Sequence, residues 1–224
     1  DVMTLNRKAT MDLMDALHPK KLGFKMSWDA ETRVDLVDKE LLLAMKEAGC
    51  RMMSYGIEHG EFIQEIKGGN ATLEQSEKAV KWAHEAKIQT AGYFMIGLPN
   101  ETPATIRKTI DFAKKLDCTY ATFSITMPFP GNKLYDEAIK SGLIQLDDTW
   151  EKFVYGGVGV GGIQAPVLTT ESLSANDLEY WTKKAFREFY LRPSYIMKKL
   201  LSVRSLNDLR TYYNGYRMMK KDTV

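Results

Sequence analysis

The feature that most constrains the fold is a repeated alternation between stretches with a two-residue hydrophobic period and stretches with a 3.6-residue period. The first period is typical of strands and the second of helices. The strand candidates cover residues 24–29, 51–58, 88–98 and 119–127. They recur at intervals of roughly thirty residues, which is the length of one βα repeat. The pattern predicts an α/β fold with a parallel sheet and argues against a helical bundle or a β-sandwich.

Capping signals mark where the intervening helices begin and end. Thr72 opens a capping-box pattern, and Thr102 is followed by Pro103, which suits the first position of a helix. Gly49 and Gly142 each follow a helical stretch and are predicted to stop it. These signals agree with the periodicity, so the helix assignments rest on two independent features.

The strand pattern stops before the C-terminus. Residues 150–166 form a glycine-rich stretch, and from residue 174 onward the sequence predicts two or three helices without strands. We therefore expect residues 1–165 to form the βα region and residues 166–224 a helical extension. Residues 157–162 match G-x-G-x-x-G, but no capped helix follows them, and a phosphate cradle needs one. We interpret this segment as a mobile loop over the open end of the sheet.

Composition and charge exclude several classes of function. Hydrophobic content of 44% and charged content of 27% are typical of globular proteins. The net charge of +2 is too small for a protein that mainly holds nucleic acid. No apolar run reaches the roughly 18 residues of a membrane span, and no signal peptide is visible. We expect a cytoplasmic protein with a small-molecule substrate and, because it begins at Asp1, one cut from a longer chain.

Three of the predicted strands have a polar face. Strands of a parallel sheet are normally apolar on both faces. Here polar residues alternate with apolar ones at Asp29 and Glu31, at Ser54 and Glu58, and again at Ser124. We expect the apolar set to face the helices and the polar set to face a shared, partly solvated interior that holds a polar ligand.

The charged members of this set gather where the predicted strands end. Asp29, Glu31 and Arg33 follow the first strand, Glu58 closes the second, and residues 97–101 follow the third. Parallel α/β folds place their active sites at the carboxyl ends of the strands. The sequence therefore predicts a site at this end of the sheet.

Four segments resemble, in order and spacing, motifs of radical S-adenosylmethionine (SAM) enzymes, and the closest resemblance is to their cobalamin-binding branch. The segments are residues 28–35 (WDAETRVD), 49–58 (GCRMMSYGIE), 92–102 (GYFMIGLPNET) and 128–135 (PFPGNKLY). Residues 185–193 also resemble the C-terminal helices of that branch. The similarity therefore covers nearly the whole chain.

The resemblance implies a TIM-like partial (βα)6 barrel, of which this chain supplies about the last four βα units, followed by the helical extension. It implies a full-length enzyme that cleaves SAM reductively at a 4Fe-4S cluster, with ferredoxin or flavodoxin as electron donor. The family's cysteine triad and cobalamin domain have no counterpart in this sequence, so we expect this stretch alone to be inactive. Cys50 and Cys118 do not match the cluster motif and are interpreted as small buried side chains.

The resemblance also implies four acidic or basic contacts to SAM. Glu58 would accept hydrogen bonds from the ribose hydroxyls or pair with the ammonium group. Asp29 and Glu31 would be further acceptors, and Arg33 would hold the carboxylate with its fork of N–H donors.

The remaining predicted SAM contacts come from the backbone. Gly97 would let the adenine lie against Met95 and Ile96, whose amide and carbonyl groups would pair with its edge. His59 follows Glu58 where the branch often has serine, which departs from the usual pattern. No residue of this chain is assigned as a metal ligand or as a catalytic group.

The substrate and the reaction stay open. Reactions of the branch include methyl transfer to an unactivated carbon and the anaerobic oxidative cyclisation of magnesium-protoporphyrin monomethyl ester. Two other functions also stay open. One is a degenerate barrel that acts as a binding or assembly module; the other is an unrelated α/β barrel enzyme that uses Asp29 and Glu58 for acid/base chemistry. That enzyme would keep its activity in air and without iron.

Overall fold

The computed structural model describes residues 2–63, 66, 71–131, 133–142, 169–170 and 172–222. Four strands form one sheet in the order β1-β2-β3-β4, and β2 pairs in parallel with both β1 and β3. The strands are β1 Trp28–Thr32, β2 Cys50–Glu58, β3 Gln89–Ile96 and β4 Tyr120–Ile125. The succession of parallel strands and helices confirms the predicted α/β class.

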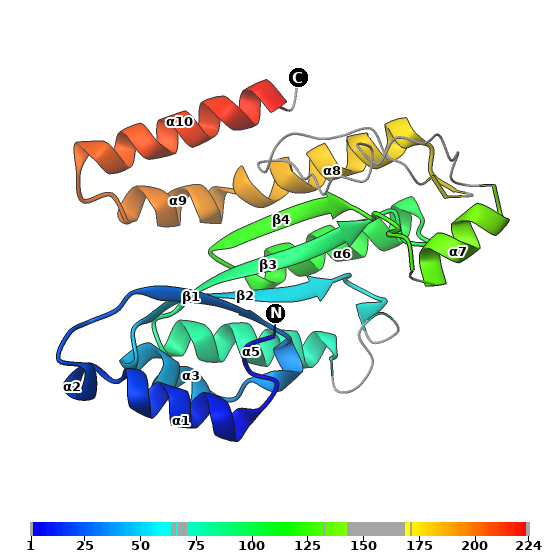
Figure 1. Ribbon diagram of the computed structural model, residues 1–224. Helices are drawn as coiled ribbons and strands as arrows, with labels where there is room; N and C mark the ends of the chain where they lie inside the picture. The colour runs from blue at the N-terminus through cyan, green and yellow to red at the C-terminus, as the bar shows by residue number, and fades with distance from the viewer. Residues whose placement is uncertain are drawn as a thin grey trace. The chain divides into compact units, whose positions relative to one another are not determined.

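Helices precede, connect and follow the strands (Figure 1). Before and between the strands they are α1 Arg7–Leu17, α2 Pro19–Leu22, the 3-10 helix η1 Val34–Leu36, α3 Lys39–Glu47, α5 Leu73–Glu85 and α6 Pro103–Leu116. After β4 come α7 Lys133–Lys140, α8 Ala175–Tyr190, α9 Pro193–Leu201 and α10 Leu206–Asp222. The last three confirm the predicted helices from residue 174 onward. None of the described helices is long and apolar enough to cross a membrane.

Side-chain caps define the helix ends as the sequence predicts. The Thr72 hydroxyl accepts a hydrogen bond from the Gln75 amide at 3.1 Å at the start of α5. Asp38 accepts one from the Leu41 amide at 2.8 Å at the start of α3. Gly49 ends α3 with a φ of 101°, a conformation that favours glycine.

The chain divides into two compact units. The first comprises Asp1–Phe94 and Asp111–Ala121, and the second comprises Met95–Ile110 and Thr122–Val224. In the first unit, helices α1, α3 and α5 lie on one side of β1 and β2 (Figure 1). Leu41, Met45 and Met53 are fully buried between these layers.

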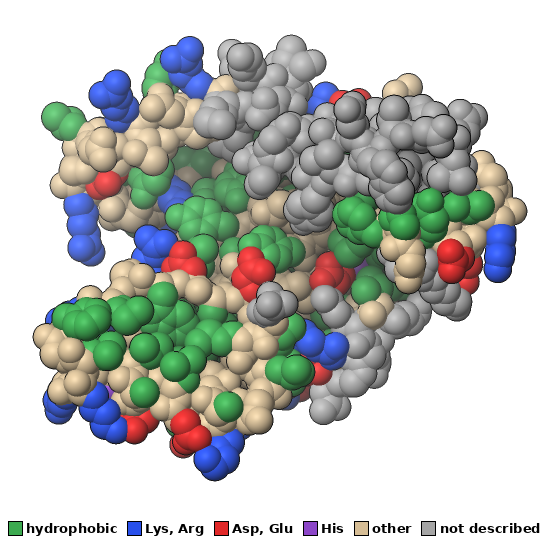
Figure 2. All heavy atoms as spheres, viewed as in Figure 1, with side chains coloured by type: hydrophobic (Ala, Val, Ile, Leu, Met, Phe, Trp, Pro, Cys, Tyr) green, Lys and Arg blue, Asp and Glu red, His purple; other side chains and the backbone are tan. Residues whose placement is uncertain are grey.

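The second unit is built around α8. The Phe189 ring of α8 packs edge-on against the Phe123 ring of β4, with 6.2 Å between centroids. Arg107 of α6 holds Glu188 of α8 through two hydrogen bonds of 2.7 and 3.0 Å. Apolar and basic side chains share the surface of α9 and α10 (Figure 2).

The first strand begins four residues later than the sequence predicts. Its pairing with β2 starts at Trp28, opposite Cys50. Phe24 and Met26 are exposed, so their alternation does not mark a buried strand. The prediction that Asp29 follows this strand is therefore wrong: Asp29 and Glu31 both lie within β1.

The predicted division into an apolar and a polar face is confirmed for β1 and β2. Ala30 and Thr32 are buried on the side that carries the helices, while Asp29 and Glu31 are exposed. A polar side chain on the opposite face can thus meet a ligand without disturbing the core.

Tyr55 carries a hydroxyl that the core does not satisfy. The side chain is fully buried, and no hydrogen-bond partner for this hydroxyl exists in the described part of the chain. We expect Tyr55→Phe to raise the free energy of unfolding by about 1 kcal/mol, because it removes an unpaired buried polar atom. Urea denaturation measures the change. A loss of stability would show that the hydroxyl has a partner.

Candidate functional site

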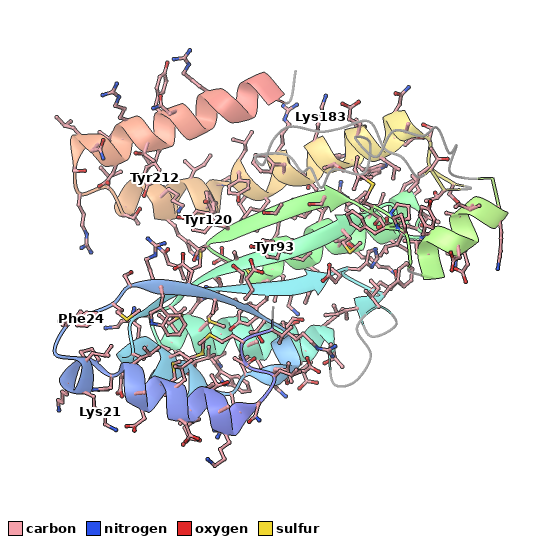
Figure 3. The ribbon with its side chains drawn as sticks, viewed as in Figure 1. Lys21, Phe24, Tyr93, Tyr120, Lys183 and Tyr212 are labelled. Carbon is pink, nitrogen blue, oxygen red and sulfur yellow. The ribbon has the colours of Figure 1, made fainter. Side chains whose placement is uncertain are left out.

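A cavity of about 500 Å³ lies on the first unit, over the face of β1, β2 and β3 that does not carry α1 and α3. Its volume is within the range of small-molecule sites. We call it the inner-face cavity, and it is lined by Met3, Asp29, Ala30, Glu31, Met52, Ser54 and Tyr93. Figure 3 labels Tyr93 on β3.

Polar side chains from all three strands meet in the inner-face cavity. The Tyr93 hydroxyl donates to Glu31 Oε1 at 3.2 Å. Arg51 binds Asp29 through Nη2 at 2.8 Å and Nε at 3.2 Å. Ser54 stands opposite Glu31 in the β1–β2 register and is 4% exposed.

The N-terminal segment contributes the remaining wall of the cavity. The Met3 amide donates to the Glu31 carbonyl at 3.3 Å, and the Thr4 hydroxyl is hydrogen-bonded to that of Thr32. These bonds hold the segment along the edge of β1. Met3 thereby comes to line the cavity, a placement that the sequence did not predict.

Glu58 closes β2, as the sequence predicts. Its backbone has a φ of 67°, a conformation that non-glycine residues rarely adopt. The register with β3 shifts between Gly56 and Glu58, so a bulge sets the direction of the strand end. Strained backbone of this kind is frequent at binding sites.

The strand register separates Glu58 from the other predicted carboxylates of this unit. Glu31 is paired with Ser54, and Asp29 is paired with Met52. On β2, Ser54 lies four residues before Glu58 and Met52 lies six residues before it. At about 3.3 Å per residue these separations are about 13 and 20 Å along β2. The structure therefore brings Asp29 and Glu31 together but does not bring Glu58 to them.

His59 organises the turn after Glu58. Its Nδ1 accepts hydrogen bonds from the Glu61 amide at 3.0 Å and the Phe62 amide at 3.1 Å. The ring is fully buried and stacks on Phe62 with 4.6 Å between centroids. An accepting Nδ1 carries no proton, so the neutral Nε2–H tautomer is the one that fits this turn.

Arg33 uses its fork of N–H donors within the protein. Nε and Nη2 each bind one carboxylate oxygen of Asp35 at 2.9 Å. A ligand carboxylate at Arg33 would have to compete with this pair.

In the second unit, the predicted backbone contacts lie at the end of β3. Met95 and Ile96 are its last residues, and Gly97 follows with a φ of 93°. The amides of Gly97 and Leu98 both donate to Glu101 Oε2, the second over 3.0 Å. The Glu101 carboxylate is fully buried and shapes this turn, although the sequence argument gave it no role.

Other groups of the second unit also meet this turn. The Ile96 carbonyl accepts a hydrogen bond from the Thr126 amide at 2.7 Å. A Cβ added to Gly97 would lie 3.1 Å from Leu178 Cδ2 of α8. Close packing and a positive φ thus account for glycine at this position, and the adenine contact stays a prediction.

The sequence argument assigned no ligand contact to Ser54, Tyr93 or Glu101, although it placed Glu101 among the residues that follow the third strand. Ser54 belonged to the predicted polar face, and extending the same alternation to β3 would have placed Tyr93 on that face. Glu101 has no periodic signal, because its role depends on a turn within one loop. Residues 157–162, which the sequence predicts as a loop over the open end of the sheet, lie outside the described residues.

The described residues contain no group of three His, Cys, Asp or Glu side chains that could hold a metal ion. Cys50 and Cys118 are both buried, as predicted, and neither forms a disulfide with another described residue. The described residues therefore supply no ligand set for a metal cluster.

The buried thiols give a simple test of the core. Burial raises the pKa of the Cys50 thiol to about 12, so this thiol stays protonated at pH 8. Because the thiolate is the reactive form, we expect iodoacetamide at pH 8 to leave Cys50 and Cys118 unmodified in the folded chain. Mass spectrometry should find both alkylated in denaturant. Rapid labelling without denaturant would contradict the buried placement.

The parallel sheet and the helices that connect its strands define an α/β protein of the partial βα-barrel type. Residues 5–113 of the chain match the family model of the radical SAM superfamily. This confirms the superfamily predicted from the motifs.

Similar proteins point to the same superfamily. The chain is 35% identical over 225 residues to an uncharacterized methyltransferase of Pyrococcus horikoshii, covering 96% of this chain and 46% of that protein. It is 28% identical over 192 residues to the anaerobic magnesium-protoporphyrin IX monomethyl ester cyclase of Cereibacter sphaeroides, covering 84% of this chain and 30% of that protein. The chain thus spans less than half the length of these relatives.

Among solved structures, the fold is similar to the radical SAM methyltransferase TsrM from Kitasatospora setae, whose structure has cobalamin and a 4Fe-4S cluster bound. The TM-score is 0.55 at 22% identity, over 66% of this chain and 29% of TsrM. This similarity supports the predicted partial-barrel fold.

Proposed function

We propose that this chain is the SAM-binding barrel portion of a cobalamin-dependent radical SAM enzyme. As a full-length protein it would methylate an unactivated carbon or carry out an oxidative cyclisation on a small molecule, with ferredoxin or flavodoxin as electron donor. Support comes from relatives named as methyltransferases and as a cyclase, and from the cobalamin and cluster bound in TsrM. SAM supplies the methyl group or a carbon radical in such reactions.

Glu58 is the observation that carries this proposal. It is a half-buried carboxylate at the carboxyl end of a parallel strand, on strained backbone that fixes its direction. We assign it to the ribose hydroxyls or the ammonium group of SAM. Met95, Ile96 and Gly97 remain the proposed adenine contacts, and Arg33 remains a proposed partner for the SAM carboxylate.

Binding and turnover together test the proposal. The full-length protein, reconstituted with iron and sulfide without oxygen, should form 5′-deoxyadenosine or S-adenosylhomocysteine from SAM. Glu58→Gln should weaken SAM binding about tenfold, because it removes a charge-assisted hydrogen bond. Glu47→Gln, on the outer surface of α3, removes the same charge and should change nothing. Activity in air and without iron would instead favour the acid/base alternative.

A further inference from the structure

We propose that the inner-face cavity is a subsite for an ammonium group of the substrate, separate from the SAM contact at Glu58. This inference rests on the proposed function, because it assigns the second reactant of the same enzyme. It also reassigns Asp29 and Glu31, which the motif resemblance placed on SAM.

The first argument is a hydroxyl at the cavity wall that has no protein partner. Ser54 lines the cavity and is 4% exposed, yet none of the described residues forms a hydrogen bond with its hydroxyl. A hydroxyl that faces a cavity and has no protein partner can bind water or a polar group of a ligand there. A polar group that enters the cavity would satisfy Ser54.

The second argument is charge. The Asp29 carboxylate is neutralised by Arg51, which binds both of its oxygens. Glu31 has only the neutral Tyr93 hydroxyl as a side-chain partner among the described residues. Glu31 is therefore an exposed carboxylate of the cavity that has no ion pair among the described residues, and a cation is the ligand that complements its charge.

The third argument is the rest of the wall. Met3 and Met52 present flexible, polarizable thioether side chains to the same space. Such side chains accommodate the carbon skeleton next to an ammonium group. An anionic ligand would be repelled by Glu31, and Arg51 is already bound to Asp29. The cavity therefore disfavours carboxylates and phosphates.

The fourth argument is position. Measured along the strand direction, Glu31 is about 13 Å and Asp29 about 20 Å from the level of Glu58. A molecule bound through Glu58 would leave the inner-face cavity open to a second molecule. Two polar sites along one face suit an enzyme that brings two reactants together.

Three compounds of matched size test the charge preference: 2-phenylethylamine, 2-phenylethanol and phenylacetate. Each is titrated into the 15N-labelled 224-residue chain, and amide shifts are followed by NMR. We expect the amine to shift the amides of Asp29, Glu31 and Ser54 and to bind at least fivefold more tightly than the alcohol. Phenylacetate should not bind. Equal binding of all three, or no binding of the amine, would overturn the proposal.

Variants connect the preference to Glu31. Glu31→Gln should weaken amine binding about tenfold and leave alcohol binding unchanged, while Glu47→Gln serves as the matched control for charge. Ser54→Ala should weaken the amine and the alcohol alike, about threefold. The amide spectrum of each variant verifies that it is folded. An amine affinity insensitive to Glu31→Gln would also overturn the proposal.

S-adenosylhomocysteine separates this proposal from the SAM assignment. Its binding should weaken about tenfold in Glu58→Gln and stay unchanged in Glu31→Gln. If Glu31→Gln weakens both ligands, Glu31 belongs to the SAM site and the separate subsite is refuted. If the amine binds as expected but S-adenosylhomocysteine does not bind at all, the proposed function fails while the cation preference of the cavity stands.

Discussion

Gly49→Ala is expected to lower the free energy of unfolding by about 4 kcal/mol. A Cβ at this position would lie 2.2 Å from the Met26 carbonyl oxygen, which is backbone and cannot swing away. The φ of 101° adds about 1–2 kcal/mol for any residue with a side chain. Overpacking adds about 1–3 kcal/mol more. Relief of the overlap would also disturb the Trp28 amide, which donates to the Gly49 carbonyl at 3.3 Å.

Gly23→Ala is the matched control for this prediction. Gly23 ends α2 with a φ of 76°, but nothing lies within 4 Å of the position its Cβ would take. It should therefore show the conformational cost alone, about 1–2 kcal/mol. Urea denaturation of both variants gives the two values. Equal losses would mean that the contact with Met26 contributes nothing.

The sequence predicted the parallel α/β fold because its two hydrophobic periods are set by local backbone geometry. It placed the start of the first strand incorrectly because alternation alone does not create a strand. Residues 24–27 alternate in the same way as β1, but pairing with β2 begins only at Trp28. Where a strand begins depends on its neighbour, and the neighbour is distant in sequence.

The same limit applies to the candidate site. Alternation correctly placed Asp29, Glu31 and Ser54 on one face, because period two is a property of the strand itself. The position of each residue along that face depends on the register between strands. The sequence therefore joined Glu31 and Glu58 in one site, and the register places them about 13 Å apart. The ion pair between Arg33 and Asp35 could not be predicted either, because the sequence offers each of these side chains several oppositely charged partners.

Glu101→Ala should have the largest local effect in the second unit. The substitution leaves the amides of Gly97 and Leu98 without their acceptor, and both residues are buried. Each unsatisfied buried amide costs about 1–3 kcal/mol, so we expect a loss of about 3 kcal/mol or more. The turn after β3 would also lose the bonds that fix its direction. The proposed adenine contacts at Gly97 would then weaken as well.

Glu101→Gln distinguishes this positioning role from a role of the charge. Oε2 alone accepts from both amides, and the single carbonyl oxygen of glutamine can do the same. We expect the glutamine variant to lose only about 1 kcal/mol, because charge-assisted bonds become neutral ones. Hydrogen exchange of the Gly97 and Leu98 amides provides the local readout: it should be fast in the alanine variant and slow in the glutamine variant. Equal exchange in both variants would mean that something other than Glu101 holds the turn. The expected contrast would identify the buried Glu101 side chain as the group that fixes the backbone at the end of β3.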